Sequence, residues 1–227
     1  MKRFLPFIII AAVLVVAVLL AWVLLRSSQQ ASKLTNASTQ TADSEPPGAQ
    51  PPHLRGNANA PVTLEEFGDF QCPTCGVYYG EIKKIEDEFG DRLRVIFREF
   101  PLVPTHQHGL EAAQAAEAAG LQGQAHFWEM HDKLYENQKA WSDVKDVMPM
   151  FIDYAKQIGI DTDRFARDLS GEAVAARIFQ DGKRGHALGV NSTPTFFVNG
   201  KELKSDSFSP EGLRELIKKS LSGAARQ

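Results

Sequence analysis

The chain has 227 residues, of which 43% are hydrophobic and 23% charged, and 25 Lys and Arg against 28 Asp and Glu give a net charge of −3 at pH 7. With 17 Gly, 12 Pro and 2 Cys, it is not a collagen-like, coiled-coil or disulfide-scaffold protein. Residues 56–227 hold 20 basic and 26 acidic residues, a net charge of −6. This acidic balance argues against nucleic-acid binding, which needs a basic surface.

Residues 4–25 are 22 consecutive apolar residues without a charge, about 33 Å as a helix against a bilayer core of roughly 30 Å. The run is longer than the apolar region of a cleaved signal peptide, and no small-x-small cleavage site follows it closely. We therefore predict a transmembrane signal anchor over residues 1–26. Lys2 and Arg3 precede the run and only Arg26 follows it closely, so the N-terminus is expected in the cytoplasm and the rest of the chain outside.

Residues 27–55 are rich in Ser, Thr, Gln and Ala and then in Pro, so they have little apolar surface to bury. This composition is typical of a flexible, disordered linker, with a typical reach of about 30 Å for this length. Residues 56–227 are long enough to form one domain with a sizeable core.

The domain is expected to begin with a strand over residues 62–67, because polar and apolar residues alternate there. Val62, Leu64 and Glu66 share one face of this strand, so Glu66 is an acid on an otherwise apolar face. An amphipathic helix follows, with apolar or thiol residues at 75, 78, 82, 85 and 89, and Gly90 ends it. Residues 92–100 alternate again and predict a second strand.

Residues 106–188 are predicted to form an all-helical insertion. Its expected helices cover residues 109–119, 125–136, 147–157, 161–169 and 172–187. The chain then returns to strand character at residues 190–198, and Asn199 and Gly200 form a hairpin turn into residues 201–204. A last helix is marked by Ser209 as N-cap and Pro210 as its first residue. The order strand, helix, strand, helical block, hairpin, helix predicts an α/β domain.

Both cysteines lie in one motif, Cys72-Pro73-Thr74-Cys75, at the start of the first predicted helix. Two intervening residues bring the sulfurs within bonding reach, and the first thiol faces the free N–H groups and positive dipole end of the helix. That environment stabilises a thiolate. We therefore assign Cys72 as the nucleophile and Cys75, one turn into the helix, as the resolving thiol; the strand before the motif and the helix after it strengthen this redox interpretation.

Two other roles for the cysteines are weaker. A zinc or copper site would recruit histidines, but none of the six stands at a short ligand spacing from the motif. A purely structural disulfide would close a loop of only two residues and so stabilise the fold little. We expect neither a metal nor a cofactor. His126 and His131 lie in a helix with several aromatic residues, where packing or a satisfied polar contact is expected and a chemical role is not.

Two further positions support the redox interpretation. Pro194 stands in strand-like sequence, where a proline cannot donate to a ladder, and a cis bond after Thr193 would explain it. In a thiol-exchange enzyme this bond would lie beside Cys72 and leave the Thr193 backbone free to pair with an extended substrate; the alternative is an ordinary edge or turn proline. Glu66 would lie beneath Cys75 and accept its proton, with a pKa raised by burial; the alternative is a glutamate at the edge of the core with access to solvent.

The segments LEEFGDFQCPTC and TPTFFVNGK, with a helical block between them, resemble the DsbA-like thiol:disulfide oxidoreductases of the thioredoxin superfamily, including membrane-tethered members. The resemblance covers the chain from about residue 56 to the C-terminus. It implies a thioredoxin fold with a helical insertion, and it places the family's nucleophilic and resolving cysteines on Cys72 and Cys75, its cis-proline on Pro194 after Thr193, and its buried acid on Glu66.

Thr74 stands where the strongly oxidising branch of this family, with its C-P-H-C motif, has a histidine. A histidine there helps to stabilise the thiolate, so its absence predicts a milder oxidant.

The resemblance implies an oxidase that forms disulfide bonds in exported proteins through the Cys72–Cys75 pair. Its substrates would be unfolded or partly folded secreted proteins, and its partner a membrane redox protein, either a quinone-linked oxidase or a donor of thiol reductant. We expect a monomer in the inner (plasma) membrane, crossing it once, with a periplasmic or otherwise extracytoplasmic catalytic domain. A disulfide reductase or isomerase would use the same residues, and a tethered binding or chaperone module would use the groove around Pro194, Phe196 and Phe70.

Overall fold

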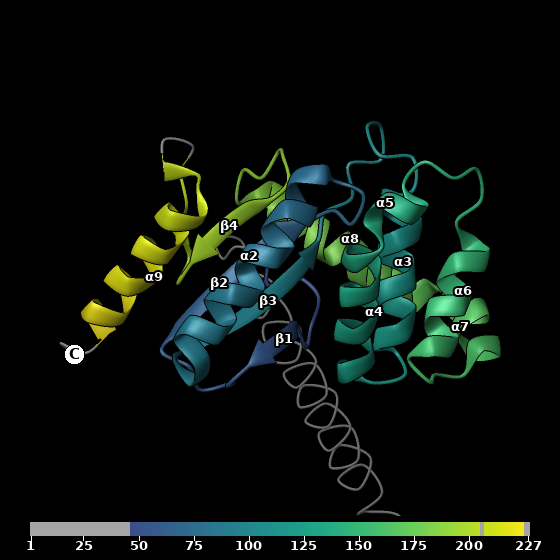
Figure 1. Cartoon of the computed structure of the whole chain (residues 1–227), viewed down its shortest axis with the longest axis horizontal. Helices are drawn as coiled ribbons and strands as arrows, with labels where there is room; N and C mark the ends of the chain where they lie inside the picture. Colours follow the sequence, from purple (N-terminus) through teal and green to yellow (C-terminus); the bar gives the residue numbers. More distant parts are fainter. Residues whose placement is uncertain (1–45, 205–206, 225–227) are drawn as a thin grey trace, which may run out of the picture. The chain divides into compact units, whose positions relative to one another are not determined.

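The computed structural model describes residues 46–204 and 207–224, in which a mixed five-stranded sheet carries helices on both of its faces (Figure 1). The strands lie in the order β1-β3-β2-β4-β5. β2 and β3 run parallel, and every other neighbouring pair runs antiparallel. The strands are β1 (His53–Gly56), β2 (Val62–Gly68), β3 (Leu93–Glu99), β4 (Thr195–Val198) and β5 (Lys201–Glu202).

The two faces of β2 differ as its alternating sequence predicts. Val62 and Leu64 are fully buried in the larger hydrophobic cluster with the apolar side of α2 (Pro73–Phe89), whereas Phe67 belongs to a second cluster on the opposite face. α2 buries the residues at 75, 78, 82, 85 and 89, as the spacing of three and four indicates. It ends at Gly90, whose φ of 52° is easily adopted only by glycine.

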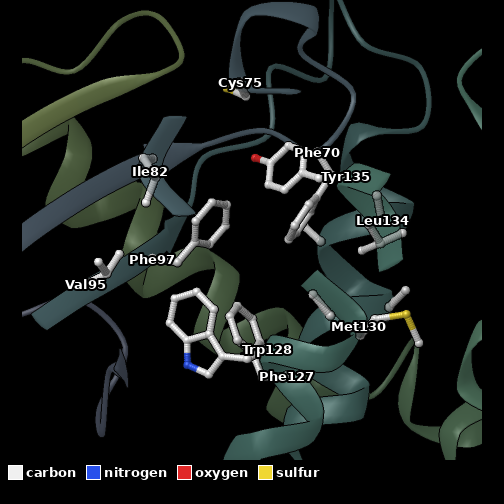
Figure 2. Packing of buried hydrophobic residues seen from close by; sticks show 14 of the residues in the cluster. Phe70, Cys75, Ile82, Val95, Phe97, Phe127, Trp128, Met130, Leu134 and Tyr135 are labelled. Atoms are coloured by element: carbon white, nitrogen blue, oxygen red, sulfur yellow. The ribbon is translucent and has the colours of Figure 1, made fainter. Parts of the chain in front are cut away.

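The helical insertion between β3 and β4 is confirmed. It consists of α3 (Gly109–Gly120), α4 (Gln124–Glu136), α5 (Gln138–Trp141), α6 (Met148–Gln157), α7 (Thr162–Asp168) and α8 (Glu172–Ala187). The buried residues of α3 are mostly alanines, which lets α4 approach closely. Figure 2 shows how Phe127 and Trp128 of α4 meet Phe97 of β3, with Phe70 and Tyr135 nearer to Cys75. The insertion and the sheet therefore share one core.

The last helix, α9 (Pro210–Ala224), begins at the predicted place, and the Gly212 N–H donates to the Ser209 side chain at 3.0 Å. It packs beside α2 on one face of the sheet, and Gly185 of α8 lies against Phe67 and Phe100 on the other face. The sheet thus has a helical layer on each side.

The prediction of a flexible linker over residues 27–55 is wrong for its last ten residues. Residues 53–56 form β1 at the edge of β3. Just before it, the Ala49 N–H donates to Asp181 at 2.7 Å and the Ala49 carbonyl accepts from Arg98 at 2.9 Å. The composition of this segment did not indicate that it has a defined structure. Hydrogen bonds from its backbone to buried charged side chains hold it in place, and such contacts leave no apolar pattern in the sequence.

The strand expected over residues 190–198 is also shorter, because β4 begins only at Thr195, after the proline. The predicted membrane anchor over residues 1–26, and residues 27–45 of the predicted linker, lie outside the described residues. Within the described part of the chain, every helix is too short or too polar to cross a bilayer.

Candidate active site

Cys72 lies at the N-cap of α2, directly before Pro73, the first residue of the helix. Its N–H donates to the Asp69 carbonyl at 3.0 Å, and its own carbonyl accepts the Gly76 N–H at 3.1 Å. Cys75 lies one turn further on, and both cysteines are free thiols. Cys72 is 6% exposed and Cys75 is completely buried, so one sulfur lies at the surface of the site and the other beneath it.

The surroundings of Cys72 favour its thiolate. The pKa of Cys72 is lowered to about 5, chiefly by a hydrogen bond from the Cys75 thiol and also by the backbone of Cys75 and Thr74 at the start of the helix, while burial opposes the shift. These donors are what the first turn of a helix offers to an anion, since its N–H groups have no partner within the helix. Cys72 is therefore ionised at neutral pH.

Cys75 behaves in the opposite way. Burial raises the pKa of its thiol well above the usual value, and the hydrogen bond to Cys72 and the charge of Glu66 raise it further. The dithiol thus holds a single proton at neutral pH, carried by Cys75 and shared with the Cys72 sulfur. A nucleophile and a protonated partner at hydrogen-bond distance form the arrangement that thiol–disulfide exchange needs.

A distant segment completes the site. The bond between Thr193 and Pro194 is cis, and the Cys72 sulfur lies 3.3 Å from the Thr193 carbonyl oxygen, to which it donates in its protonated form, across a sequence separation of 121 residues. A cavity of about 380 Å³ opens beside this contact and is lined by Thr74, Ser192, Thr193, Pro194, Thr195, Glu202, Leu203 and Phe208. The structure therefore brings the dithiol and the predicted proline loop together.

Glu66 lies on the face of β2 that α2 covers and is 3% exposed, so it is a buried acid rather than a glutamate at the edge of the core. Burial raises its pKa to about 8; Glu86 and Cys72 add to the shift, and Arg55 opposes it. The charge of Glu66 in turn raises the pKa of Cys75. Protonated Glu66 and buried Cys75 thus lie within electrostatic reach of each other.

Glu65, the neighbour of Glu66, shows which register β2 adopts. Glu65 points to the opposite face, where Arg98 contacts its carboxylate at 2.8 Å and Arg184 at 2.9 Å. The hydrogen bonds to Arg184 and Arg98 hold the pKa of Glu65 below its usual value although burial opposes them. Glu65 is thus a paired structural ion, and Glu66 is the acid on the side of the dithiol.

Two residues that the sequence analysis missed shape the loop before α2. Asp69 is a buried carboxylate that accepts the N–H groups of Gln71 and Leu102 at 2.8 and 2.7 Å. Gln138, in the short helix α5, donates its side-chain amide to the carbonyl of Cys72 at 2.8 Å. Asp69 could have been noticed as an acid between a strand and the motif, but nothing near Gln138 in the sequence indicates its contact.

His131 packs among aromatic side chains and His126 makes a polar contact with Glu129 at 2.7 Å, which are the two arrangements that the sequence analysis expects. His131 packs among Phe97, Trp128 and Tyr135, and burial lowers its pKa to about 4. It is therefore neutral at physiological pH.

Comparison with known proteins agrees with this geometry. The model of a thioredoxin family, Thioredoxin_4, matches residues 49–219, so the chain belongs to that family. Among solved structures, BdbD from Bacillus subtilis in its oxidised form is 29% identical, with a TM-score of 0.67 over 75% of this chain and 93% of that one. Alpha-DsbA1 from Wolbachia pipientis is 20% identical, with a TM-score of 0.67 over 78% and 94% of the two chains.

The family match and the fold shared with BdbD make the chain a DsbA-like member of the thioredoxin superfamily. Curated relatives include proteins named as Na(+)/H(+) antiporters. The NhaA 1 protein of Mycolicibacterium gilvum is 40% identical over 153 residues, which are 66% of this chain and 23% of that protein. The NhaA protein of Herminiimonas arsenicoxydans is 33% identical over 214 residues, 94% of this chain and 33% of that protein. This chain spans about a quarter to a third of the length of these relatives.

Proposed function

We propose that the protein is a disulfide oxidase for exported proteins, with Cys72 as the sulfur that exchanges with substrate and Cys75 as the resolving thiol. The observation that carries the proposal is the pair of opposite pKa shifts, about 5 for Cys72 and well above the usual value for Cys75. A stabilised Cys72 thiolate favours the reduced form of the dithiol. The disulfide form is therefore an oxidant, which passes its bond to substrate thiols.

Oxidation of a substrate proceeds in two exchanges. A substrate thiolate attacks the Cys72 sulfur of the Cys72–Cys75 disulfide, and Cys75 leaves as a thiolate that takes a proton from the buried acid Glu66. A second substrate thiolate then attacks the substrate sulfur of the mixed disulfide and releases the Cys72 thiolate, which is a good leaving group because of its low pKa. The substrate gains one disulfide, and the protein takes up its two electrons.

The loop around Pro194 is suited to hold an extended chain during this exchange. The cavity beside Thr193 and Pro194 opens next to Cys72, and the Thr193 backbone lies at the sulfur. An extended substrate segment that pairs with this backbone, as in strand addition, brings its cysteine to Cys72. Unfolded or partly folded polypeptides present such segments, whereas folded domains do not.

The long apolar run of residues 4–25 supports a location of this chemistry at a membrane. We place the domain outside the plasma membrane, anchored by residues 1–26 with a cytoplasmic N-terminus, because disulfides persist in oxidising compartments. A membrane quinone-linked oxidase would regenerate the disulfide. A membrane donor of thiol reductant would instead run the same residues as a reductase or isomerase.

The decisive experiment measures the direction of electron flow in cells. Acid trapping and thiol alkylation should find wild-type Cys72 and Cys75 mainly in the disulfide form, and Cys75→Ala should accumulate mixed disulfides between Cys72 and exported proteins. Mass spectrometry of these adducts identifies the clients and the partner together. A dithiol that is kept reduced in cells would contradict the oxidase direction.

The Cys72→Ser variant separates thiol chemistry from binding. We expect it to lose all oxidase activity while its circular dichroism spectrum stays unchanged. The chain would be a tethered chaperone instead if Cys72→Ser still suppressed the aggregation of unfolded proteins as well as wild type, and if Cys75→Ala formed no mixed disulfide in cells.

A further inference from the structure

Two glutamates of the sheet and a tyrosine of α4 are buried near one another below α2. In the parallel pairing of β2 and β3, Glu66 lies beside Phe97 and Gly68 beside Glu99, so both glutamates belong to the same face. The third residue is Tyr135, which extends from α4 on the side of Cys75 (Figure 2). A Cβ added to Gly68 would lie 3.1 Å from the Tyr135 hydroxyl oxygen, which places this hydroxyl at the strand position paired with Glu99 and two residues along β2 from Glu66.

These side chains lack the hydrogen bonds that their burial demands. Glu66, Glu99 and Tyr135 are 3, 1 and 6% exposed. One carboxyl oxygen of Glu66, both carboxyl oxygens of Glu99 and the Tyr135 hydroxyl have no hydrogen-bond partner among the described residues. An unpartnered buried polar group costs about 1–3 kcal/mol, and clustered groups of this kind are normally bridged by internal water.

We propose that Tyr135 and Glu99 are positioning residues that extend the buried acid Glu66, through internal water, into a proton relay for Cys75. This inference rests on the proposed function, because it needs Cys75 to act as the resolving thiol. When the Cys75 thiolate leaves the disulfide, it takes the proton of Glu66, and Glu66 is protonated again from Glu99 by way of the Tyr135 hydroxyl and water. Glu99 then recovers its proton from solvent by way of Asp69 and His106. In the reverse direction each proton returns along the same groups, so no net charge stays buried.

The groups that face Glu99 keep it protonated. They are Glu117 on α3, Asp181 and Arg177 on α8, and Asp69 before α2; the three acids disfavour its charged form and only the arginine favours it. Burial is the largest cause and raises the pKa of Glu99 well above the usual value. A neutral carboxylic acid both donates and accepts a hydrogen bond, as a relay requires.

The groups that face Glu66 and Tyr135 also favour the protonated form of each. Burial and the charges of Glu86 and Cys72 disfavour the ionised form of Glu66, and Arg55 opposes them. Burial also raises the pKa of Tyr135 well above the usual value, and nearby acids add to this shift. Tyr135 therefore stays a phenol, which can pass a proton but cannot trap a charge.

Asp69 connects this cluster to the surface. It interacts electrostatically with Glu99 and with Tyr135. Its carboxylate also lies 2.7 Å from Nδ1 of His106, whose side chain is 14% exposed. His106 lines a groove of about 1130 Å³ that also reaches Pro73 and Tyr135 beside the dithiol. Protons of the relay can thus exchange with solvent through Asp69 and His106.

The test uses a chromogenic aromatic disulfide and the full-length reduced protein. The reagent reacts first with Cys72 to form a mixed disulfide, and Cys75 then attacks this bond and releases a second chromophore. The first phase reports Cys72, and the second reports the deprotonation and attack of Cys75. Both phases are recorded from acid to alkaline pH for wild type, Tyr135→Phe, Glu99→Gln and the control Tyr154→Phe, which removes a hydroxyl from α6 in the insertion.

We expect Tyr135→Phe and Glu99→Gln each to slow the second phase at least about tenfold at neutral pH and to change its pH profile, with the first phase unchanged. Tyr135→Phe removes only a hydroxyl without a protein partner, so the free energy of unfolding should not fall. In a Glu66→Gln background, Tyr135→Phe should have no further effect, because both residues act on the same proton. Tyr154→Phe should leave both phases as in wild type.

A second phase within about twofold of wild type in both variants would overturn the relay, as would equal slowing of both phases. Additive effects of Glu66→Gln and Tyr135→Phe would also overturn it. The proposed function fails differently: a wild-type protein without any second phase would show that Cys75 does not resolve mixed disulfides, and the relay would fall with it.

Discussion

Reduction of the Cys72–Cys75 disulfide should make this protein harder to unfold at neutral pH. In an unfolded chain a cysteine thiol has a pKa of about 8.5, whereas the pKa of Cys72 in the folded, reduced protein is about 5. At pH 7 this difference stabilises the folded reduced form by about 2 to 3 kcal/mol. The same free energy corresponds to roughly 40 to 60 mV in the potential of the two-electron couple, in the oxidising direction.

The pH dependence follows from the sign of the shift. A folded-state pKa that is lowered gives stability that is complete above the unfolded value of about 8.5 and is lost as the pH falls through the folded value. Between about pH 5 and 8.5 the advantage of the reduced form should therefore grow by up to about 1.4 kcal/mol per pH unit. The raised pKa of Glu66, about 8, acts with the opposite sign, but its largest cause is burial, which does not depend on the redox state of the cysteines, so most of this effect should cancel in the difference.

The assay is urea unfolding of reduced and oxidised protein at a series of pH values, followed by tryptophan fluorescence. The difference in free energy of unfolding between the two forms is plotted against pH. The disulfide itself closes a loop of two residues and contributes a small term without pH dependence. Cys72→Ser under reducing conditions is the control and should lose the pH-dependent term. An oxidised form that is the more stable at pH 7, or a difference that stays flat between pH 5 and 8.5, would refute this account of the site.

Three further predictions concern single positions. Thr74→His should raise the redox potential, and an unchanged equilibrium with glutathione would contradict our explanation of the milder oxidant. Glu66→Gln should slow the reaction of Cys75 and leave alkylation of the nucleophilic thiol nearly unchanged; alkylation kinetics that slow equally for both thiols would show that the acid acts elsewhere. Gly68→Ala should lower the free energy of unfolding by about 1–3 kcal/mol, because the new Cβ would lie 2.5 Å from the Phe97 ring; urea unfolding measures this loss.

The parts of the fold that could be predicted are those with a local, periodic signal. Alternation in residues 62–67 predicted β2, and the spacing of buried residues from Cys75 to Phe89 predicted α2. Gly90 and Ser209 marked helix ends through their own backbone or side-chain chemistry. These signals need no knowledge of the rest of the chain, because each depends on neighbours within about one turn.

The parts that could not be predicted depend on contacts between distant residues. β1 is held by its pairing with β3, and the segment before it by Arg98 and Asp181, which lie far along the chain from Ala49. The same is true of Gln138, which reaches the Cys72 carbonyl across 66 residues. Composition alone made residues 46–55 look like a linker, since polar anchoring leaves no hydrophobic pattern.

The chemistry of the dithiol is therefore divided between local and distant structure. The first turn of α2 and Thr74 lie within the motif and can be changed by local substitution, but the Thr193 carbonyl comes from a segment 121 residues away. Glu66, whose charge raises the pKa of Cys75, comes from a separate strand. Transfer of the four-residue motif to another helix start would carry over only the helix-end donors and the cysteine pair. The difference in pKa between the two thiols would then shrink, because the burial of Cys75, the largest cause of its raised pKa, and the acid Glu66 would stay behind.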